Sequence, residues 1–286
     1  MKNHKIKSYC KINLFLKVIK KLNNGYHSIK SLITFCEIYD LITISRIKQS
    51  KDYVSFSGEF KKNISQKSNT VTKVLFLLRK NKLIKNQNFK INVEKNIPHG
   101  SGLGGASSNA ANLLNFFNLK LKLKLNKKKI QKMAEKIGFD VPIILERKNT
   151  FLTGEKNKIL RLNKKFRLNL LIAYPNIICS TKKIYEKNKK ISKLERVFFY
   201  NKDKKRLIEY LKNQRNDLED NVIKTYPKVG KVVKYIKSQN GCCFSRITGS
   251  GSACIGIFSN MKKAIRAQRL VKLKYPKYWI KVSKTI

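Results

Sequence analysis

The segment Asn96-Ile-Pro-His-Gly-Ser-Gly-Leu-Gly-Gly-Ala-Ser-Ser-Asn-Ala-Ala111 holds four of the 13 glycines in a chain of 286 residues. Where glycine is this scarce, such a cluster indicates backbone that needs positive φ or close approach to a ligand. The segment follows a predicted strand and opens a predicted helix, so its N–H groups can hold an anion at the positive end of the helix. Phosphate is the obvious ligand. Ser107 or Ser108 could add a hydroxyl to it, or a contact to Mg²⁺.

Other glycine-loop families fit residues 100–105 less well. A dinucleotide site needs an acid about 20 residues after the loop, but no Asp or Glu lies between Glu94 and Glu135. A Walker loop needs a lysine where Ala106 stands, and a protein kinase needs an H-R-D motif, which this chain lacks. A plain glycine-rich turn capped by serine remains as an alternative. The favoured interpretation is a phosphate loop without an embedded lysine.

The formal net charge of +49 invites a nucleic-acid interpretation, which the composition disfavours. The chain has 54 Lys against 11 Arg, with 28 Asn, 32 Ile and only 8 Ala, as an A/T-biased genome would produce. A selected phosphate-binding surface would use more Arg, because its planar fork suits bidentate contacts. We therefore expect no specific nucleic-acid partner.

The other composition data favour a cytoplasmic protein with no membrane partner. No stretch approaches the roughly 18–20 apolar residues of a membrane span, and no secretory signal follows the N-terminus. The six cysteines form no C-x-x-C pair and fit a reducing compartment, and this spacing together with only three histidines argues against a zinc site.

Hydrophobic periodicity predicts an α+β fold with a domain boundary near 155–165. Asn69 or Ser68 is expected to cap the first helix and Asn126 the third. Residues 119–125 fit either an edge strand or a connector. Strands are predicted at 9–19, 29–46 (one or two), 89–93, 142–145, 150–153, 158–162, 168–174, 242–248, 252–258 and 278–283, and helices at 70–84, 107–118, 127–137, 181–188, 204–212, 217–238 and 260–271.

The loop motif Pro98-x-Gly-x-Gly-Leu-Gly-Gly-x-Ser-Ser-Asn-Ala-Ala111 resembles the ATP-binding motif of the GHMP kinases, which include galactokinase and the homoserine, mevalonate and phosphomevalonate kinases. Further motifs of the family occur along the chain, before and after this loop, in the order typical of the family. They are Lys11-Ile-Asn-Leu-Phe-Leu16 with Gly25-Tyr-His27, Gly138-Phe-Asp-Val-Pro142, Thr181-Lys-Lys-Ile-Tyr185, Asn216-Asp217 and Arg246-Ile-Thr-Gly-Ser-Gly-Ser252. The resemblance spans nearly the whole chain.

The resemblance implies a two-domain fold around a central cleft. An N-terminal β-α domain that binds ATP would cover residues 1–160, and a C-terminal ferredoxin-like domain residues 161–286. The extra glycine before the Ser-Ser pair is typical of one branch of the family. That branch implies ATP-dependent phosphorylation of the 2-hydroxyl of 4-(cytidine 5′-diphospho)-2-C-methyl-D-erythritol, with Mg²⁺, for isoprenoid precursor synthesis. A monomer or homodimer is expected.

The resemblance also implies roles for two charged residues. Asp140 would accept the proton of the substrate hydroxyl, because an alcohol is a poor nucleophile without a positioned base. Lys11 would lie beside Asp140, keep the carboxylate ionised and neutralise developing charge. Without the resemblance, Asp140 would be interpreted as a solvated loop acid, and Lys11 would be interpreted as one of many surface lysines.

The remaining expected contacts fall into two groups. For ATP and its phosphates the set is Asn69, Pro98, His99, Gly100, Ser101, Gly102, Leu103, Gly104, Gly105, Ala106, Ser107 and Ser108. For the substrate it is Asn13, Tyr26, His27, Thr181, Tyr185, Gly249, Ser250 and Gly251. Tyr26 and Tyr185 offer ring faces to the cytosine, and His27 offers directional hydrogen bonds. Asn13 would bind hydroxyls or cap a turn, and Asn69 would contact the nucleoside or cap a helix.

Three residues depart from the family pattern, and two rival functions remain open. Phe139 replaces a small alanine beside Asp140, which leaves the local packing open. Ser101 and Ala106 stand where glycine is common. The rivals are another GHMP kinase, of mevalonate or homoserine type, and a basic RNA-binding protein. Gly25-Tyr-His27 and Tyr185 disfavour the first.

Overall fold

The computed structural model describes residues 3–22, 25, 27–154, 158–193 and 203–286. These residues form two compact units that alternate along the chain. The first unit comprises Met1–Cys10, Ile38–His99 and Gly104–Arg147, and the second Lys11–Glu37, Gly100–Leu103 and Lys148–Ile286. The division expected at residues 160 and 161 stays a prediction.

Two long strands, β1 (His4–Lys21) and β2 (His27–Ile47), pair with each other and contribute residues to both units. In the first unit, the end of β2 pairs antiparallel with β4 (Asn88–Glu94), and β3 (Tyr53–Ser57) pairs parallel with β4. The hydrophobic periodicity of the sequence predicts no helix or strand at β3. This strand is only five residues long and half-exposed, so its pairing with β4 gives it its form.

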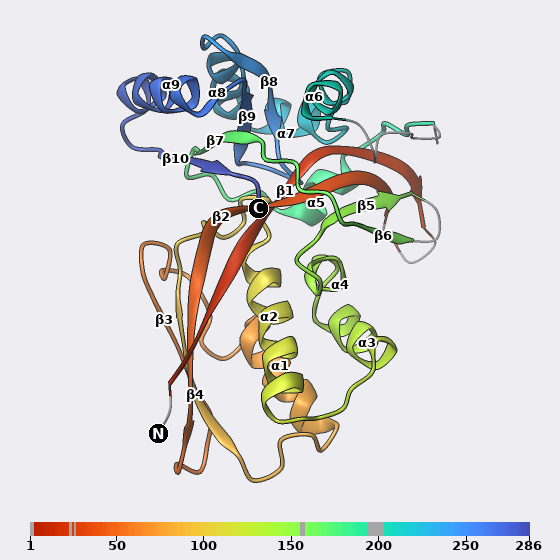
Figure 1. Ribbon diagram of the computed structural model, residues 1–286, viewed down its shortest axis with the longest axis vertical. Helices are drawn as coiled ribbons and strands as arrows, with labels where there is room; N and C mark the ends of the chain where they lie inside the picture. Colours follow the sequence, from red (N-terminus) through yellow and green to blue (C-terminus); the bar gives the residue numbers. More distant parts are fainter. Residues whose placement is uncertain (1–2, 23–24, 26, 155–157, 194–202) are drawn as a thin grey trace. The chain divides into compact units, whose positions relative to one another are not determined.

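Four helices belong to the first unit: α1 (Thr70–Lys80), α2 (Gly105–Lys120), α3 (Lys127–Ile137) and α4 (Asp140–Ile144). Figure 1 shows them together on one side of strands β2, β3 and β4. The side chains of Asn69 and Asn126 cap α1 and α3, as expected. Residues 121–126 form a turn and connector rather than an edge strand.

The strand predicted at 142–145 is wrong, because these residues belong to α4 and its C-terminal end. Val141, Pro142, Ile143 and Ile144 are all buried, so the run has no alternation that would distinguish a strand from a short buried helix. Pro142 lies in the first turn of α4, where its missing N–H costs nothing.

The described residues of the second unit include strands of two sheets. The first half of β2 pairs with β5 (Asn149–Thr153), and β5 pairs with β6 (Ile159–Leu162). Strands β7 (Asn169–Tyr174), β8 (Cys242–Ile247), β9 (Cys254–Phe258) and β10 (Trp279–Lys284) form an antiparallel sheet in the order β10-β7-β9-β8. Helices α8 (Pro227–Lys237) and α9 (Met261–Lys274) pack on it. This β-α-β-β-α-β arrangement is ferredoxin-like, as the resemblance implied.

Three further helices lie among the described residues of the second unit: α5 (Thr181–Glu186), α6 (Lys204–Lys212) and α7 (Glu219–Thr225). The single helix predicted at 217–238 is wrong, because α7 ends and α8 begins at Tyr226-Pro227. Proline has no N–H and clashes with the preceding turn, so it starts a helix more readily than it continues one.

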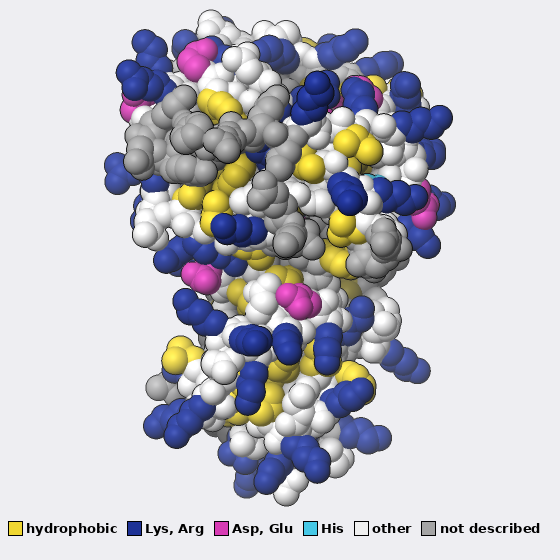
Figure 2. All heavy atoms as spheres, turned by 90° about the vertical axis from the view of Figure 1, so that its right-hand side faces the viewer, with side chains coloured by type: hydrophobic (Ala, Val, Ile, Leu, Met, Phe, Trp, Pro, Cys, Tyr) yellow, Lys and Arg dark blue, Asp and Glu magenta, His cyan; other side chains and the backbone are white. Residues whose placement is uncertain are grey.

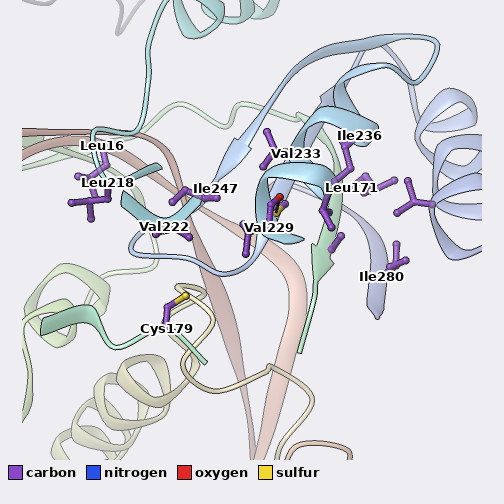
Figure 3. Packing of buried hydrophobic residues seen from close by; sticks show 14 of the residues in the cluster. Leu16, Leu171, Cys179, Leu218, Val222, Val229, Val233, Ile236, Ile247 and Ile280 are labelled. Carbon is purple, nitrogen blue, oxygen red and sulfur yellow. Dashed lines mark hydrogen bonds between the residues drawn. The ribbon is translucent and has the colours of Figure 1, made fainter. Parts of the chain in front are cut away.

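An apolar cluster between α7, α8 and the strands forms the core of this unit. Figure 3 shows Leu16 beside Leu218, with Val222 and Ile247 next to them. The cluster continues through Val229, Val233, Ile236, Leu171 and Ile280. Burial of such side chains contributes most of the stabilisation of a unit of this kind.

Basic side chains are scattered over the face in Figure 2, with few acidic ones between them. No helix among the described residues combines the length and the apolar character needed to span a membrane.

In the first unit, the carboxylate of Asp40 fixes the chain just before the glycine loop. It forms a buried ion pair with Lys95, and its Oδ1 accepts hydrogen bonds from the N–H groups of Asn96 (2.8 Å) and Ile97 (2.9 Å). Its Oδ2 accepts a third bond from the amide of Asn109 on α2, at 3.0 Å. Asp40 is 0% exposed, so four otherwise unsatisfied donors depend on one side chain.

We expect Asp40→Ala to lower the free energy of unfolding by about 3–5 kcal/mol, because it leaves the Lys95 charge buried and unpaired. Chemical denaturation measures this change. The control is Glu209→Ala, which breaks the exposed pair with Lys212 and should cost less than about 1 kcal/mol. Equal losses in the two variants would contradict the anchoring role of Asp40.

Candidate active site

The glycine loop has the backbone conformation that its composition predicted. Gly100, Gly102 and Gly104 have φ values of 64°, 83° and 66°, in the left-handed region that favours glycine. Gly104 is also the N-cap of α2, and no side chain caps this helix. An uncapped N-terminus of a 16-residue helix after such a loop suits a phosphate group.

Gly102 lies against the turn that joins β8 to β9. A Cβ atom at Gly102 would overlap the carbonyl oxygen of Thr248 and would lie 3.2 Å from the nitrogen of Gly251. The carbonyl of Ser101 accepts a hydrogen bond from the N–H of Ala253 at 3.0 Å. Two of the motifs identified in the sequence, around residues 100 and 250, are therefore in backbone contact.

Lys11 lies in β1 beside the same loop. Its N–H donates to the carbonyl of Leu103 at 3.0 Å, and its Nζ donates to Oδ1 of Asn13 at 2.6 Å. The side chain is only 4% exposed, unlike an ordinary lysine. Lys11 is therefore a buried cation that hydrogen bonds hold in one place.

Asn13 connects Lys11 to the 248–251 turn. Its N–H donates to Oγ1 of Thr248 at 2.8 Å, and its Nδ2 donates to Oγ of Ser31 at 2.8 Å. Ser31 in turn donates to the carbonyl of Phe15 at 2.6 Å. Neither a turn nor a helix end is present at Asn13, so the capping alternative is wrong. Its observed partners are protein groups.

His27 and Tyr185 form an aromatic pair. Their ring centroids are 5.1 Å apart and the planes are tilted by 33°. Burial, and to a lesser extent the positive charge of Lys21, lower the pKa of His27 below its ordinary value. The imidazole is therefore neutral near pH 7 and has one donor and one acceptor nitrogen. Tyr26, which was expected to join this pair, lies outside the described residues.

Other predicted substrate contacts lie at or next to the 248–251 turn. The hydroxyls of Thr181 and Ser250 lie 2.9 Å apart. Gly249 and Gly251 have φ values of 57° and 75°, which explains why glycine occurs at both positions. Thr181 begins α5, whose N-cap is Ser180.

In the first unit, several of the predicted ATP contacts lie at two helix N-termini. Asn69 caps α1, which is the second of the two roles expected for it. Its Oδ1 accepts hydrogen bonds from the N–H groups of Val71 and Thr72. The hydroxyl of Ser108 is buried and donates to the carbonyl of Tyr9 at 2.6 Å, whereas Ser107 is half-buried. Ser107 is therefore the better placed of the two serines for an external ligand.

The residues on either side of the glycines are also placed. Pro98 is buried, and His99 is half-buried. Burial, and then the charge of Lys95, lower the pKa of His99. Gly105 and Ala106 begin α2, and the carbonyl of Ala106 accepts a hydrogen bond from Thr70 at 2.9 Å.

Asp140 is the first residue of α4 and is half-buried. The N–H of Val141 donates to the carbonyl of Gly138 at 3.1 Å, which fixes the turn before it. Phe139 is 63% exposed, so the larger side chain extends into solvent and needs no space in the core. Ser101 and Ala106 do not have positive φ, so neither departure strains the loop.

Sequence reasoning missed three polar side chains that support these elements: Ser31 and Asp40, which are buried, and Glu219, which is half-buried. One signal could have found Asp40. With 16 acids in 286 residues, an aspartate inside the apolar run Ile38-Tyr-Asp-Leu-Ile42 is conspicuous, because a buried carboxylate requires partners.

Comparison with known proteins agrees with this geometry. The GHMP kinases N terminal domain matches residues 69–147, and the GHMP kinases C terminal domain matches residues 194–277. A protein of Pelagibacter ubique (strain HTCC1062) named 4-diphosphocytidyl-2-C-methyl-D-erythritol kinase is 39% identical over 288 residues, and the match covers 100% of both chains.

Two solved structures have the same fold. A 4-(cytidine 5′-diphospho)-2C-methyl-D-erythritol kinase matches with a TM-score of 0.73 and 22% identity over 98% of this chain and 99% of its own. A homoserine kinase from Cytophaga hutchinsonii matches with a TM-score of 0.74 and 14% identity over 100% and 95%. The two domain matches and the full-length relative lead to one conclusion. This chain belongs to the GHMP kinase family.

Proposed function

We propose that this protein transfers the γ-phosphoryl group of ATP to the 2-hydroxyl of 4-(cytidine 5′-diphospho)-2-C-methyl-D-erythritol, in the synthesis of isoprenoid precursors. The relative with 39% identity carries the name of this activity. The observation that carries the proposal is the buried chain Lys11–Asn13–Thr248 beside the glycine loop. It holds a cation next to groups suited to phosphate.

The glycine loop and the start of α2 would hold the phosphates of ATP. The uncapped N-terminus of α2 and the left-handed glycines support this role. Mg²⁺, when bound, would neutralise charge on the transferred phosphate. Ser107 is the residue that would contact it, because its side chain is half-buried and that of Ser108 is committed to Tyr9.

Asp140 would accept the proton of the attacking hydroxyl. The carboxylate lies at the start of a short helix whose backbone Pro142 restricts, so few conformations compete with the productive one. Lys11 would stabilise negative charge that develops during transfer, because its buried ammonium is fixed before substrate binds.

The tilted His27–Tyr185 pair supports a nucleobase site. A neutral imidazole can read donors and acceptors on cytosine, and an aromatic ring can stack on it. Tyr26 is proposed as a further ring at this site. Thr181, Ser250 and the glycines of the 248–251 turn would approach the diphosphate, and Asn13 the erythritol hydroxyls.

We place the enzyme in the cytoplasm. None of its six cysteines, all of which the structure describes, forms a disulfide, and burial raises the pKa of Cys179 to about 11 and that of Cys242 to about 12. Such thiols suit a reducing compartment.

The first test concerns the substrate. In a coupled assay with Mg-ATP, the protein should phosphorylate the cytidyl erythritol compound and leave mevalonate and homoserine unchanged, because only the first offers a base to His27 and Tyr185. Turnover of mevalonate without turnover of the cytidyl compound would overturn the assignment.

The second test concerns the base. Asp140→Asn keeps the size of the side chain but removes its basicity, so kcat should fall by about 10²–10⁴-fold with little change in KM. Glu135→Gln removes an exposed acid from the same unit and is the matched control. Near-parental kcat in a folded Asp140→Asn enzyme, with chemistry rate-limiting, would assign Asp140 to positioning alone.

The third test concerns the loop. Gly102→Ala should weaken ATP binding by about tenfold or more, because the added methyl group meets the backbone of Thr248 and forces the loop to move. Gly241→Ala is the control: its φ is also positive (80°), but its neighbour is the flexible side chain of Lys263. Calorimetric ATP titration compares them, and equal affinity in both variants would show that the loop is only a turn.

A further inference from the structure

Residues 215–219 (Arg-Asn-Asp-Leu-Glu), which we call the 215–219 segment, lie along β1 just after Lys11 and Asn13. Leu16 and Asn216 form a parallel bridge. The N–H of Leu16 donates to the carbonyl of Arg215 at 3.2 Å, and the N–H of Asp217 donates to the carbonyl of Leu16 at 2.8 Å. The backbone of the segment is therefore fixed to the strand that carries Lys11.

Asp217 strengthens this attachment with its side chain. It is 1% exposed, and its Oδ2 accepts hydrogen bonds from the N–H of Val18 (2.8 Å) and the hydroxyl of Ser192 (2.7 Å). Its Oδ1 accepts from Nε of Arg215 at 2.9 Å. A buried carboxylate with three donors is a rigid attachment point.

Asn216 extends in the other direction, to the turn at 248–251. Its Nδ2 donates to the carbonyls of Gly249 (2.8 Å) and Ile247 (3.2 Å), and its Oδ1 accepts from the N–H of Leu218 at 3.0 Å. The side chain is 4% exposed. One amide thus satisfies three backbone groups, and aspartate in its place would present an oxygen to two carbonyl oxygens.

A second contact from the 215–219 segment holds the same strand end. Oε2 of Glu219 accepts a hydrogen bond from the N–H of Ile247 at 2.7 Å. Arg246, the residue before, is also fixed: its guanidinium donates to the carbonyls of Leu14 (3.0 Å) and Leu211 (2.7 Å). The N–H and the carbonyl of Ile247 are therefore both bound by side chains of the 215–219 segment.

The turn itself needs such support. It contains two glycines with positive φ, and glycine loses more conformational freedom on ordering than any other residue. The turn also accepts the close approach of Gly102 and binds Asn13 through Thr248. A small displacement would therefore move several groups of the proposed site together.

We propose that Asn216 is a positioning residue for catalysis: it fixes the 248–251 turn relative to β1 and so sets the groups that meet the diphosphate of the substrate. This inference rests on the proposed function. Asn216 acts through the turn, and the turn carries the contact.

The test compares Asn216→Ala and Asn216→Asp with Asn169→Ala. Asn169 is the matched control, because it is also a buried amide (7% exposed) that donates to backbone carbonyls, those of Phe258 and Ser259, at the opposite end of the same sheet. Both Asn216 variants should raise KM for the cytidyl substrate about tenfold or more, whereas Asn169→Ala should lower the unfolding midpoint and leave KM unchanged. A KM at the parental level in both folded Asn216 variants would overturn the proposal.

A second measurement does not depend on activity. Amide hydrogen exchange at Thr248 and Gly251, whose N–H groups donate within the turn, should become at least tenfold faster in Asn216→Asp and remain unchanged in Asn169→Ala. If the parent fails to use the cytidyl substrate, the proposed function fails, and exchange still tests the positioning role. Unchanged exchange in Asn216→Asp would overturn it.

Discussion

The close backbone approach of Gly102 to Thr248 is the constraint on which the site in the second unit depends. No side chain fits between them, because a Cβ atom at Gly102 would overlap the Thr248 carbonyl. Around this contact, the N–H of Lys11 donates to Leu103 and the N–H of Asn13 donates to the hydroxyl of Thr248. Segments that are distant in the sequence are thereby brought to one place, with backbone N–H groups and a buried cation close together.

Buried polar side chains, rather than apolar ones, fix the details of this arrangement. The side-chain amides of Asn13 and Asn216 each bind two or more partners. In the first unit, the carboxylate of Asp40 accepts several hydrogen bonds just before the glycine loop. Such groups are costly to bury unless every donor and acceptor is satisfied, so they allow few alternative packings. The apolar cluster in Figure 3 stabilises the unit but has no comparable directional requirement.

The fold does not select the substrate. A homoserine kinase superposes with a TM-score of 0.74 and a cytidyl-erythritol kinase with 0.73, although their names specify different alcohols. Selection must therefore come from side chains on the common scaffold. In this chain we propose the His27–Tyr185 pair for that role, and the lowered pKa of His27 favours a neutral imidazole that can form directional hydrogen bonds.

The sequence by itself determined the features that adjacent residues encode. Clustered glycines predicted the left-handed loop, and Asn69 and Asn126 predicted their helix N-termini, because these signals depend on local backbone conformation. Tertiary structure decided the rest: residues 142–144 became helical within a continuously buried run, and β3 formed by pairing with β4. It also decided which of 54 lysines is buried at the site. Lys11 is held there by Asn13, whose N–H donates to the hydroxyl of Thr248, 235 residues away. A contact across that separation depends on the path of the whole chain, which no local pattern of residues specifies.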